Sequence, residues 1–170
     1  CTRGHHIRLG AQNMAWLEEG PLTGEISPLM LQEVGVEIVE LGHSERRHVL
    51  HESSEMINRK VLCAADHGFT VLLCVGETAQ EKELGCADEV LRLQLQTGLY
   101  QVTAMQAEKL WIAYEPVWAI GAGGVTATEE YAPERPRTIR PTPCELLGHR
   151  TGSRLASSVC GGGKRDHAAA

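Results

Sequence analysis

The chain has few aromatic residues and no long apolar segment. Aromatic side chains make up 4% of its 170 residues, with a single phenylalanine, so most of any core has to be aliphatic. No apolar run approaches the roughly 20 residues that span a bilayer, and no signal-peptide pattern opens the chain. We therefore expect no membrane partner.

Clustered positive charge is also scarce. The formal net charge is −6 at pH 7, whereas binding to nucleic-acid phosphates needs grouped lysine and arginine side chains. Arginines recur between residues 135 and 154, but without interleaved aromatic residues this run is typical of a solvated or disordered segment. We expect no nucleic-acid partner.

The six cysteines form no Cys-x-x-Cys pair. Cys74 lies within an apolar run and Cys63 within a predicted helix, where a reduced cysteine behaves as a small hydrophobe. The reducing cytoplasm is therefore the expected compartment. Cys63 and His67 stand one helical turn apart, which leaves zinc as an alternative, but four ligands cannot be gathered from local spacing. We predict neither a metal nor a cofactor.

Length and composition fit a single globular domain. The 170 residues are 42% hydrophobic and 22% charged, which is ordinary for a soluble protein with a sizeable core. The first residue is Cys1 and not methionine, so we expect a chain that is trimmed or incomplete.

Strand and helix signals alternate along the first two thirds of the chain. Strands are predicted at Ile7–Gln12, Val36–Leu41, Thr70–Val75 and Lys109–Tyr114. Helices are predicted after a Ser27 cap with Pro28 at the first position, after a cap at Ser53 or Ser54, and over Ala87–Tyr100. This rhythm predicts parallel β-α-β units.

Polar residues follow each of these strands. The C-terminal ends of parallel strands meet at one edge, where α/β proteins build their sites. Gln12-Asn13, His43–Glu45, Gly76-Glu77 and Glu115 are therefore expected to converge. This convergence favours a catalytic base at Glu115 over a merely solvated glutamate. The stiff Pro116 and the glycines beyond it are typical of a loop that covers an active site.

The pattern changes after Tyr131. A proline inside a helix costs about 3 kcal/mol, so no continuous helix is expected across Pro133, Pro136, Pro141 and Pro143. We divide the chain into a domain of residues 1–131 and a divergent, Pro/Arg-rich tail of residues 132–170.

Five motifs resemble triosephosphate isomerase. In chain order they are Gly10–Asn13, Thr23–Pro28, Gly42–Arg47, Leu73–Glu77 and Tyr114–Gly121. The resemblance covers about residues 8–131 and implies a (β/α)8 TIM barrel, of which this chain would hold about four to five parallel β/α units. It also implies the interconversion of dihydroxyacetone phosphate and glyceraldehyde 3-phosphate, a glycolytic and gluconeogenic reaction.

The resemblance assigns roles residue by residue. Glu115 matches the base that moves a proton between adjacent carbons, and His43 matches the neutral imidazole that polarises the substrate carbonyl. Ser44 and Glu45 match supporting residues of the same motif. The lid is implied at Pro116–Thr126, and the contacts to the substrate phosphate at Gly121, Ala122 and Gly123 and at Gly162 and Gly163 of a faintly similar phosphate loop.

The loop from Gln12 to Thr23 resembles the dimer-forming loop of the family, so a homodimer is expected, with Gln12, Asn13 and Thr23 as its loop residues.

Two features depart from the family pattern. No residue matches the lysine that follows the family's first strand and supplies positive charge to the anionic substrate. The lid is one residue longer at Gly121–Thr126.

Three hypotheses therefore stand beside one another. The chain is a triosephosphate isomerase, or an inactive remnant that serves as an oligomerising or partner-binding scaffold, or a fragment that needs a complementing partner carrying the lysine. An incomplete barrel has open sheet edges, which recruit further strands.

Overall fold

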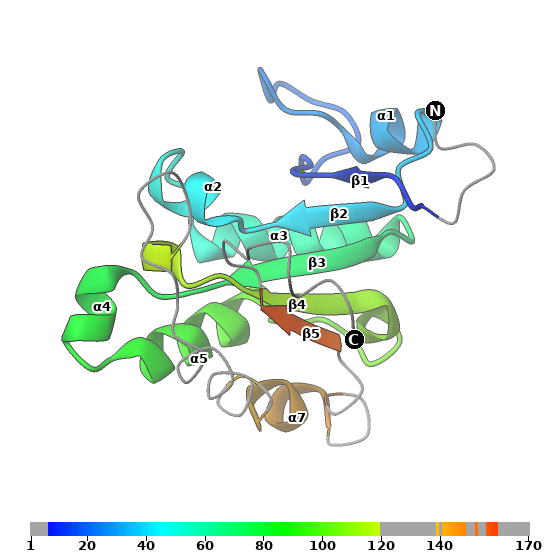
Figure 1. The fold of residues 1–170 in the computed structure, drawn as a ribbon. Coiled ribbons are helices and arrows are strands. Elements are labelled where there is room, and N and C mark those ends of the chain that lie inside the picture. Colours follow the sequence, from blue (N-terminus) through cyan, green and yellow to red (C-terminus); the bar gives the residue numbers. More distant parts are fainter. Residues whose placement is uncertain (1–6, 120–138, 140, 149–151, 153–155, 160–170) are drawn as a thin grey trace.

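The computed structural model describes residues 7–119, 139, 141–148, 152 and 156–159. Its centre is a parallel sheet of five strands that lie side by side in chain order (Figure 1). They are β1 (Gly10–Ala11), β2 (Ile38–Leu41), β3 (Thr70–Val75), β4 (Leu110–Tyr114) and β5 (Ala156–Val159). The predicted parallel β/α units are confirmed, although β1 and β2 are shorter than expected.

Three helices lie where the sequence predicts them, two of them after predicted capping residues. They are α1 (Pro28–Glu33), α3 (Ser54–Asp66) and α5 (Ala87–Gly98). The side chain of Ser27 accepts the Met30 N–H, and that of Ser53 accepts the Met56 N–H. None of the helices in the described part of the chain is long and apolar enough to cross a membrane.

Four short helices were not predicted: α2 (Ser44–His48), α4 (Ala79–Glu83) and the 3-10 turns η1 (Gln106–Lys109) and η2 (Val117–Ala119). Helices of three to five residues are too short for an apolar period to show. For α2 and α4 the capping residues His43 and Thr78 were the available signal. Thr78 and Glu81 form a reciprocal capping box at α4.

The tail contains more regular structure than its prolines suggested. Helix α7 (Pro141–Leu147) contacts α5, and β5 pairs with β4. The expectation of a solvated or disordered segment is wrong for α7, because Thr142 and Pro143 are buried. Pro141 and Pro143 are tolerated because the first-turn N–H groups of a helix have no partner within it. The division of the chain at residue 131 stays a prediction.

The two faces of the sheet differ in burial. Helix α3 contacts β2 and β3, and α5 contacts β3. The alternating residues Val39, Leu41, Val71, Leu73, Ile112 and Tyr114 are almost completely buried. On the other face Ile38, Glu40, Leu72 and Trp111 are more accessible, whereas Thr70, Cys74 and Ala113 are buried. The first face therefore carries most of the aliphatic core.

The ends of β3 and β4 approach closely at Gly76. The backbone N–H of Glu115 donates to the Val75 carbonyl at 2.8 Å. A Cβ atom at Gly76 would lie only 1.8 Å from the Glu115 carbonyl oxygen. The Gln94 amide on α5 holds Gly76 in place, accepting its N–H at 2.9 Å and donating to its carbonyl at 3.0 Å. A glycine at position 76 thus determines where Glu115 leaves the sheet.

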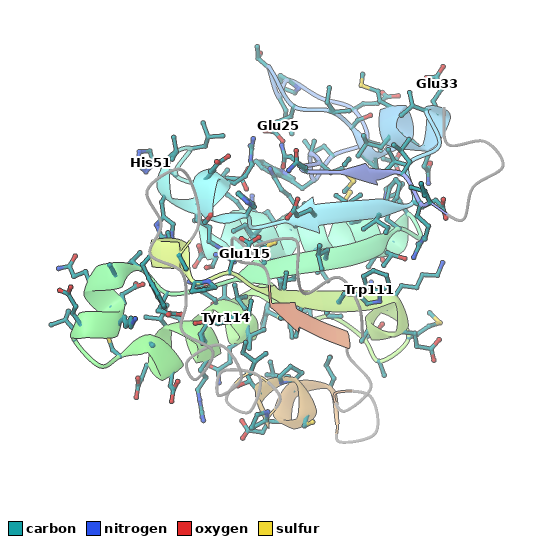
Figure 2. The ribbon with its side chains drawn as sticks, viewed as in Figure 1. Glu25, Glu33, His51, Trp111, Tyr114 and Glu115 are labelled. Carbon is teal, nitrogen blue, oxygen red and sulfur yellow. The ribbon has the colours of Figure 1, made fainter. Side chains whose placement is uncertain are left out.

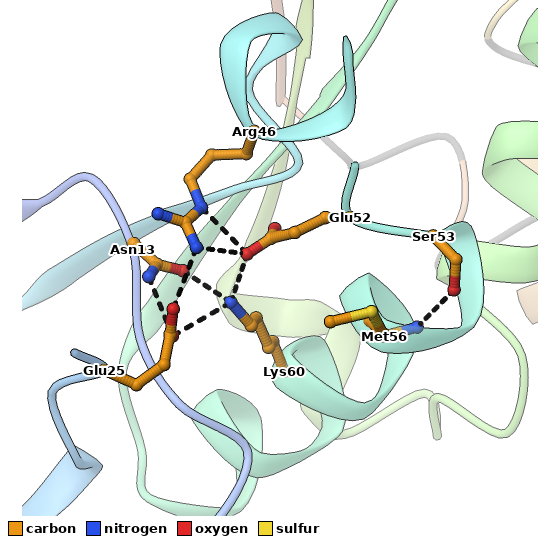
Figure 3. Close-up of polar contacts among 7 residues, drawn as sticks. All are labelled: Asn13, Glu25, Arg46, Glu52, Ser53, Met56 and Lys60. Carbon is orange, nitrogen blue, oxygen red and sulfur yellow. Dashed lines mark hydrogen bonds and ion pairs between the residues drawn. The ribbon is translucent and has the colours of Figure 1, made fainter. Parts of the chain in front are cut away.

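A buried ammonium joins the loop before α1 to α2 and α3 (Figure 3). Lys60, with 1% of its surface exposed, contacts Asn13 Oδ1 at 2.8 Å, Glu25 Oε2 at 3.1 Å and Glu52 Oε1 at 2.5 Å. Arg46 contacts the same two carboxylates. Two cations thus face two carboxylates, and such pairing is what makes buried charge tolerable. The cluster anchors the segment that carries His43.

Replacing Gly76 with alanine tests the close approach of β3 and β4. The added methyl group would overlap the Glu115 carbonyl, so we expect Gly76→Ala to lower the free energy of unfolding by about 3 kcal/mol. Gly10→Ala is the matched control, because its Cβ would meet Ile38 only at ordinary contact distances of 3.7 and 3.9 Å. Urea unfolding measures both. Equal midpoints for the two variants would contradict the described packing.

Candidate active site

Glu115 lies directly after β4, with 4% of its surface exposed (Figure 2). Its Oε2 accepts the backbone N–H of Ser44 at 3.3 Å. Its Oε1 lies 3.8 Å from Nε2 of His43. Residues 71 positions apart therefore meet because β2 and β4 both end at the same edge of the sheet. The expected meeting of His43 and Ser44 with Glu115 is confirmed.

The orientation of His43 defines where its proton sits. His43 caps α2, and its Nδ1 accepts the backbone N–H of Glu45 at 3.2 Å. A nitrogen that accepts a hydrogen bond carries no proton, so the neutral ring has its proton on Nε2. This is the nitrogen that faces Glu115. His43 therefore presents a hydrogen-bond donor beside a buried carboxylate.

The surroundings of Glu115 increase its basicity. Burial raises the pKa of its carboxyl group above the ordinary value, and the nearby Glu40 carboxylate acts in the same direction. His43, the Cys74 thiol and the Ser44 N–H lower the pKa but do not outweigh burial. A carboxylate with a raised pKa is a stronger base than an exposed glutamate, which suits proton abstraction from carbon.

A second buried carboxylate holds the segment that follows Glu115. Glu77 is fully buried, and it accepts hydrogen bonds from the Tyr114 hydroxyl at 3.0 Å and from Trp118 Nε1 at 2.9 Å. Its carbonyl accepts the Val117 N–H at 3.0 Å. Sequence reasoning placed Glu77 at the site edge but gave it no role, although a carboxylate directly after a buried strand was the available signal. Glu77 fixes the start of the predicted lid.

Arg47 ties the ends of β2 and β3 together. Its guanidinium donates to the carbonyls of Gly42 at 2.8 Å and Cys74 at 3.0 Å, and to the Ser54 hydroxyl at 3.1 Å. Burial lowers the pKa of Arg47 to about 10, so the side chain stays charged at neutral pH. In the sequence, Arg47 stands out only as the last residue of the Gly42–Arg47 motif. Its role depends on carbonyl groups that converge from separate strands.

The remaining predicted residues are placed less centrally. Glu45 is exposed and contributes its backbone N–H to His43. Gln12 is exposed and, with His43, lines a hollow of about 410 Å³ that Glu115 does not line. Asn13 belongs to the Lys60 cluster, and Thr23 is exposed. The lid from residue 120 lies outside the described residues, as do Gly121, Ala122, Gly123, Gly162 and Gly163.

Two groups of side chains contain residue types that bind metals. Among the described residues, Glu40, His43 and Glu115 place ligand atoms within 4.8 Å of one another. However, the proton on His43 Nε2 occupies the lone pair that a metal would need, so the arrangement favours proton transfer. Both ring nitrogens of His67 are engaged, with the Cys63 carbonyl at 2.7 Å and Glu18 Oε1 at 2.9 Å. The absence of a metal stays a prediction.

Comparison with known proteins agrees with this geometry. A family model described as triosephosphate isomerase matches residues 1–168. The triosephosphate isomerases of Clostridium tetani and Treponema denticola are each 46% identical to the chain, over 91% and 98% of it and over 60% and 66% of their own length. The L-erythrulose-1-phosphate isomerase of Rhizobium etli is 48% identical over 84% of the chain and 54% of its own length. The chain thus spans roughly three fifths of the relatives it matches, and by sequence and fold it belongs to the triosephosphate isomerase family.

Proposed function

We propose that the chain acts as a triosephosphate isomerase, interconverting dihydroxyacetone phosphate and glyceraldehyde 3-phosphate. The observation that carries this proposal is the pairing of the buried Glu115 carboxylate with the protonated Nε2 of His43, 3.8 Å apart. A carboxylate base and a neutral N–H donor held close together are what aldose–ketose isomerisation requires.

The reaction follows from these two groups. Glu115 removes a proton from the carbon beside the substrate carbonyl. The Nε2–H of His43 donates a hydrogen bond to the carbonyl oxygen, which stabilises the negative charge that develops there. In the enediolate that forms, the hydroxyl proton passes from the neighbouring oxygen to the former carbonyl oxygen, and Glu115 returns its proton to the carbon that carried the carbonyl, so that the new carbonyl forms at the carbon first deprotonated. The Ser44 N–H holds Oε2 of Glu115 at 3.3 Å, so Oε1 remains the oxygen directed toward His43.

The lid and the phosphate contacts complete the proposal. Glu77 would anchor the first residues of the lid, because it accepts hydrogen bonds from Val117 and Trp118. We propose phosphate contacts at Gly121, Ala122, Gly123, Gly162 and Gly163. A cytoplasmic location is part of the proposal, supported by the free cysteines of the described region.

A second substrate belongs to the same reaction class. The Rhizobium etli relative, 48% identical, is named for L-erythrulose 1-phosphate, which is also a phosphorylated α-hydroxy ketone. The Glu115–His43 pair addresses the carbonyl and its neighbouring carbon in either substrate. Assays with both compounds decide which one the chain prefers.

Removing the base should slow turnover strongly. We expect Glu115→Gln to lower kcat by about a hundredfold to ten-thousandfold, because glutamine cannot accept the proton. His43→Gln should lower kcat as well, through loss of the donor to the carbonyl oxygen. Glu37→Gln is the matched control, since Glu37 is exposed and pairs with Arg8.

A coupled assay measures turnover on the chain alone and on the chain mixed with the segment of a relative that it does not match. Turnover in either arm that depends on Glu115 supports the proposal, and turnover that requires the added segment favours a complementing pair. A folded chain with no turnover in either arm, for either substrate, contradicts the proposal.

The raised pKa of Glu115 predicts a pH-dependent stability change. The folded state holds the Glu115 proton more tightly than the unfolded state, so the ionised carboxylate destabilises the fold as pH rises above the ordinary range of glutamate. Glu115→Gln should therefore stabilise the chain more at about pH 8 than at about pH 4. Urea unfolding at the two pH values measures this difference. If Glu115→Gln stabilises the chain more at about pH 4 than at about pH 8, the proposed direction of the Glu115 pKa shift is wrong.

We also propose that the chain self-associates through the loop of residues 12–23. Apolar side chains near this loop are exposed, including Leu17 at 41%, Ile26 at 48% and Leu50 at 57%, and covering them would be favourable. Sedimentation equilibrium should detect a dimer, and Ile26→Glu should shift the chain toward monomer. A monomer at every concentration tested argues against this surface.

A further inference from the structure

The indole of Trp118 is held from two directions. Its Nε1–H donates to Glu77 Oε1 at 2.9 Å, so this carboxylate lies at the edge of the ring. The Lys82 ammonium lies 3.4 Å from the ring centroid. A cation comes this close only above the ring face, because an approach within the ring plane would overlap ring atoms. The hydrogen bond therefore fixes one edge of the indole, and the cation restricts the tilt of its plane.

Lys82 belongs to α4, a helix of five residues with no buried side chain. A helix this short is not stable by itself, so contacts outside it have to set its position. The capping box of Thr78 and Glu81 fixes its first turn directly after Glu77. The half-buried Lys82 then reaches Trp118 in the turn η2, which Figure 1 shows in yellow-green beside α4. Helix α4 thus connects the segment after β3 with the segment after β4.

The turn η2 follows Glu115 after a single buried proline, Pro116. Proline has a fixed φ angle, so a movement of η2 is passed on to the Glu115 backbone. Within the turn, the Ala119 N–H donates to the Pro116 carbonyl at 2.8 Å. The orientation of the indole and the position of the base are therefore linked by a short, stiff segment.

We propose that Lys82 is a positioning residue for Glu115 and acts through Trp118. Its ammonium holds the indole plane in the orientation in which the Nε1–H reaches Glu77, and this fixes the turn that follows the base. The two contacts reinforce each other, because donation of the N–H to a carboxylate makes the ring face more negative. The catalytic consequence rests on the proposed isomerase function, whereas the hold of Lys82 on the indole does not.

The test measures hydrogen exchange of the Trp118 indole N–H by nitrogen-15 NMR of the full chain. The chain has three tryptophans, and the Trp118 signal is the one that disappears in Trp118→Phe. Lys82→Gln removes the charge, whereas Lys82→Arg keeps a cation that stacks on aromatic faces. Lys109→Gln is the matched control, because Lys109 is an exposed lysine just before β4, at the end opposite Glu115. Circular dichroism checks folding.

We expect Lys82→Gln to speed exchange of the Trp118 indole N–H about two- to thirtyfold, the range that the strength of a cation–π contact allows. Lys82→Arg should keep most of the protection, and Lys109→Gln should keep all of it. Equal exchange rates in Lys82→Gln and in the unchanged chain overturn the proposal. An acceleration of the same size in Lys82→Arg or in Lys109→Gln also overturns it, because the effect would then not depend on a cation at position 82.

A double-mutant cycle tests whether the effect passes through the ring. With Trp118 present, Lys82→Gln should unfold at a lower urea concentration than Lys82→Arg. Trp118→Leu removes the aromatic face, so the gap between the two urea midpoints should close in that background. A gap of the same size in both backgrounds overturns the proposal. If Trp118→Leu does not fold, the exchange rates of the single variants decide by themselves.

Activity provides a readout that a merely structural contact would leave unchanged. In whichever arm of the coupled assay turns over, kcat should fall about two- to fivefold in Lys82→Gln and stay near its original value in Lys82→Arg and Lys109→Gln. An unchanged kcat in Lys82→Gln beside faster exchange overturns the link to Glu115. If no form of the chain turns over substrate while the exchange pattern holds, the isomerase proposal fails and the hold of Lys82 on Trp118 stands. If turnover is normal and the exchange pattern is absent, only the role of Lys82 is overturned.

Discussion

The candidate site depends first on the close approach of two parallel strand ends. Glu115 donates its backbone N–H to Val75, and its carbonyl lies where a side chain at Gly76 would be. The Gln94 side chain on α5 forms hydrogen bonds with both the N–H and the carbonyl of Gly76. A base that must meet a substrate carbon within a fraction of an ångström benefits from such a rigid origin. The position of Glu115 is therefore a property of the sheet and its covering helix.

Buried charges hold the parts around this base. Lys60 and Arg46 face Glu25 and Glu52, Arg47 spans the ends of β2 and β3, and Glu77 receives the Tyr114 hydroxyl and the Trp118 N–H. Lys60, Glu52 and Glu77 are almost completely buried, and their directed contacts make alternative arrangements costly. Lys60 lies on α3 and the two arginines lie on α2, so these contacts fix the helices to the loops and strand ends around them.

The buried carboxylate of Glu115 destabilises the fold when it is ionised, and the same burial strengthens it as a base. Its burial opposes ionisation, so the same environment that destabilises the folded carboxylate makes it a better base. Ser44 and His43 direct its two oxygens without fully neutralising it.

Local sequence signals determined much of this protein. Ser27 and Ser53 mark helix starts, the apolar run of β3 marks a strand, and the motifs around His43 and Glu115 identify the family and its candidate catalytic pair. Tertiary structure alone decided the partners of Lys60, Glu77, Arg47 and Glu40, because these contacts join segments that are distant in sequence or depend on which sheet face a side chain occupies. A capping bond is formed within four residues and is visible in the sequence. A buried charge finds its partner only when separate strands end side by side.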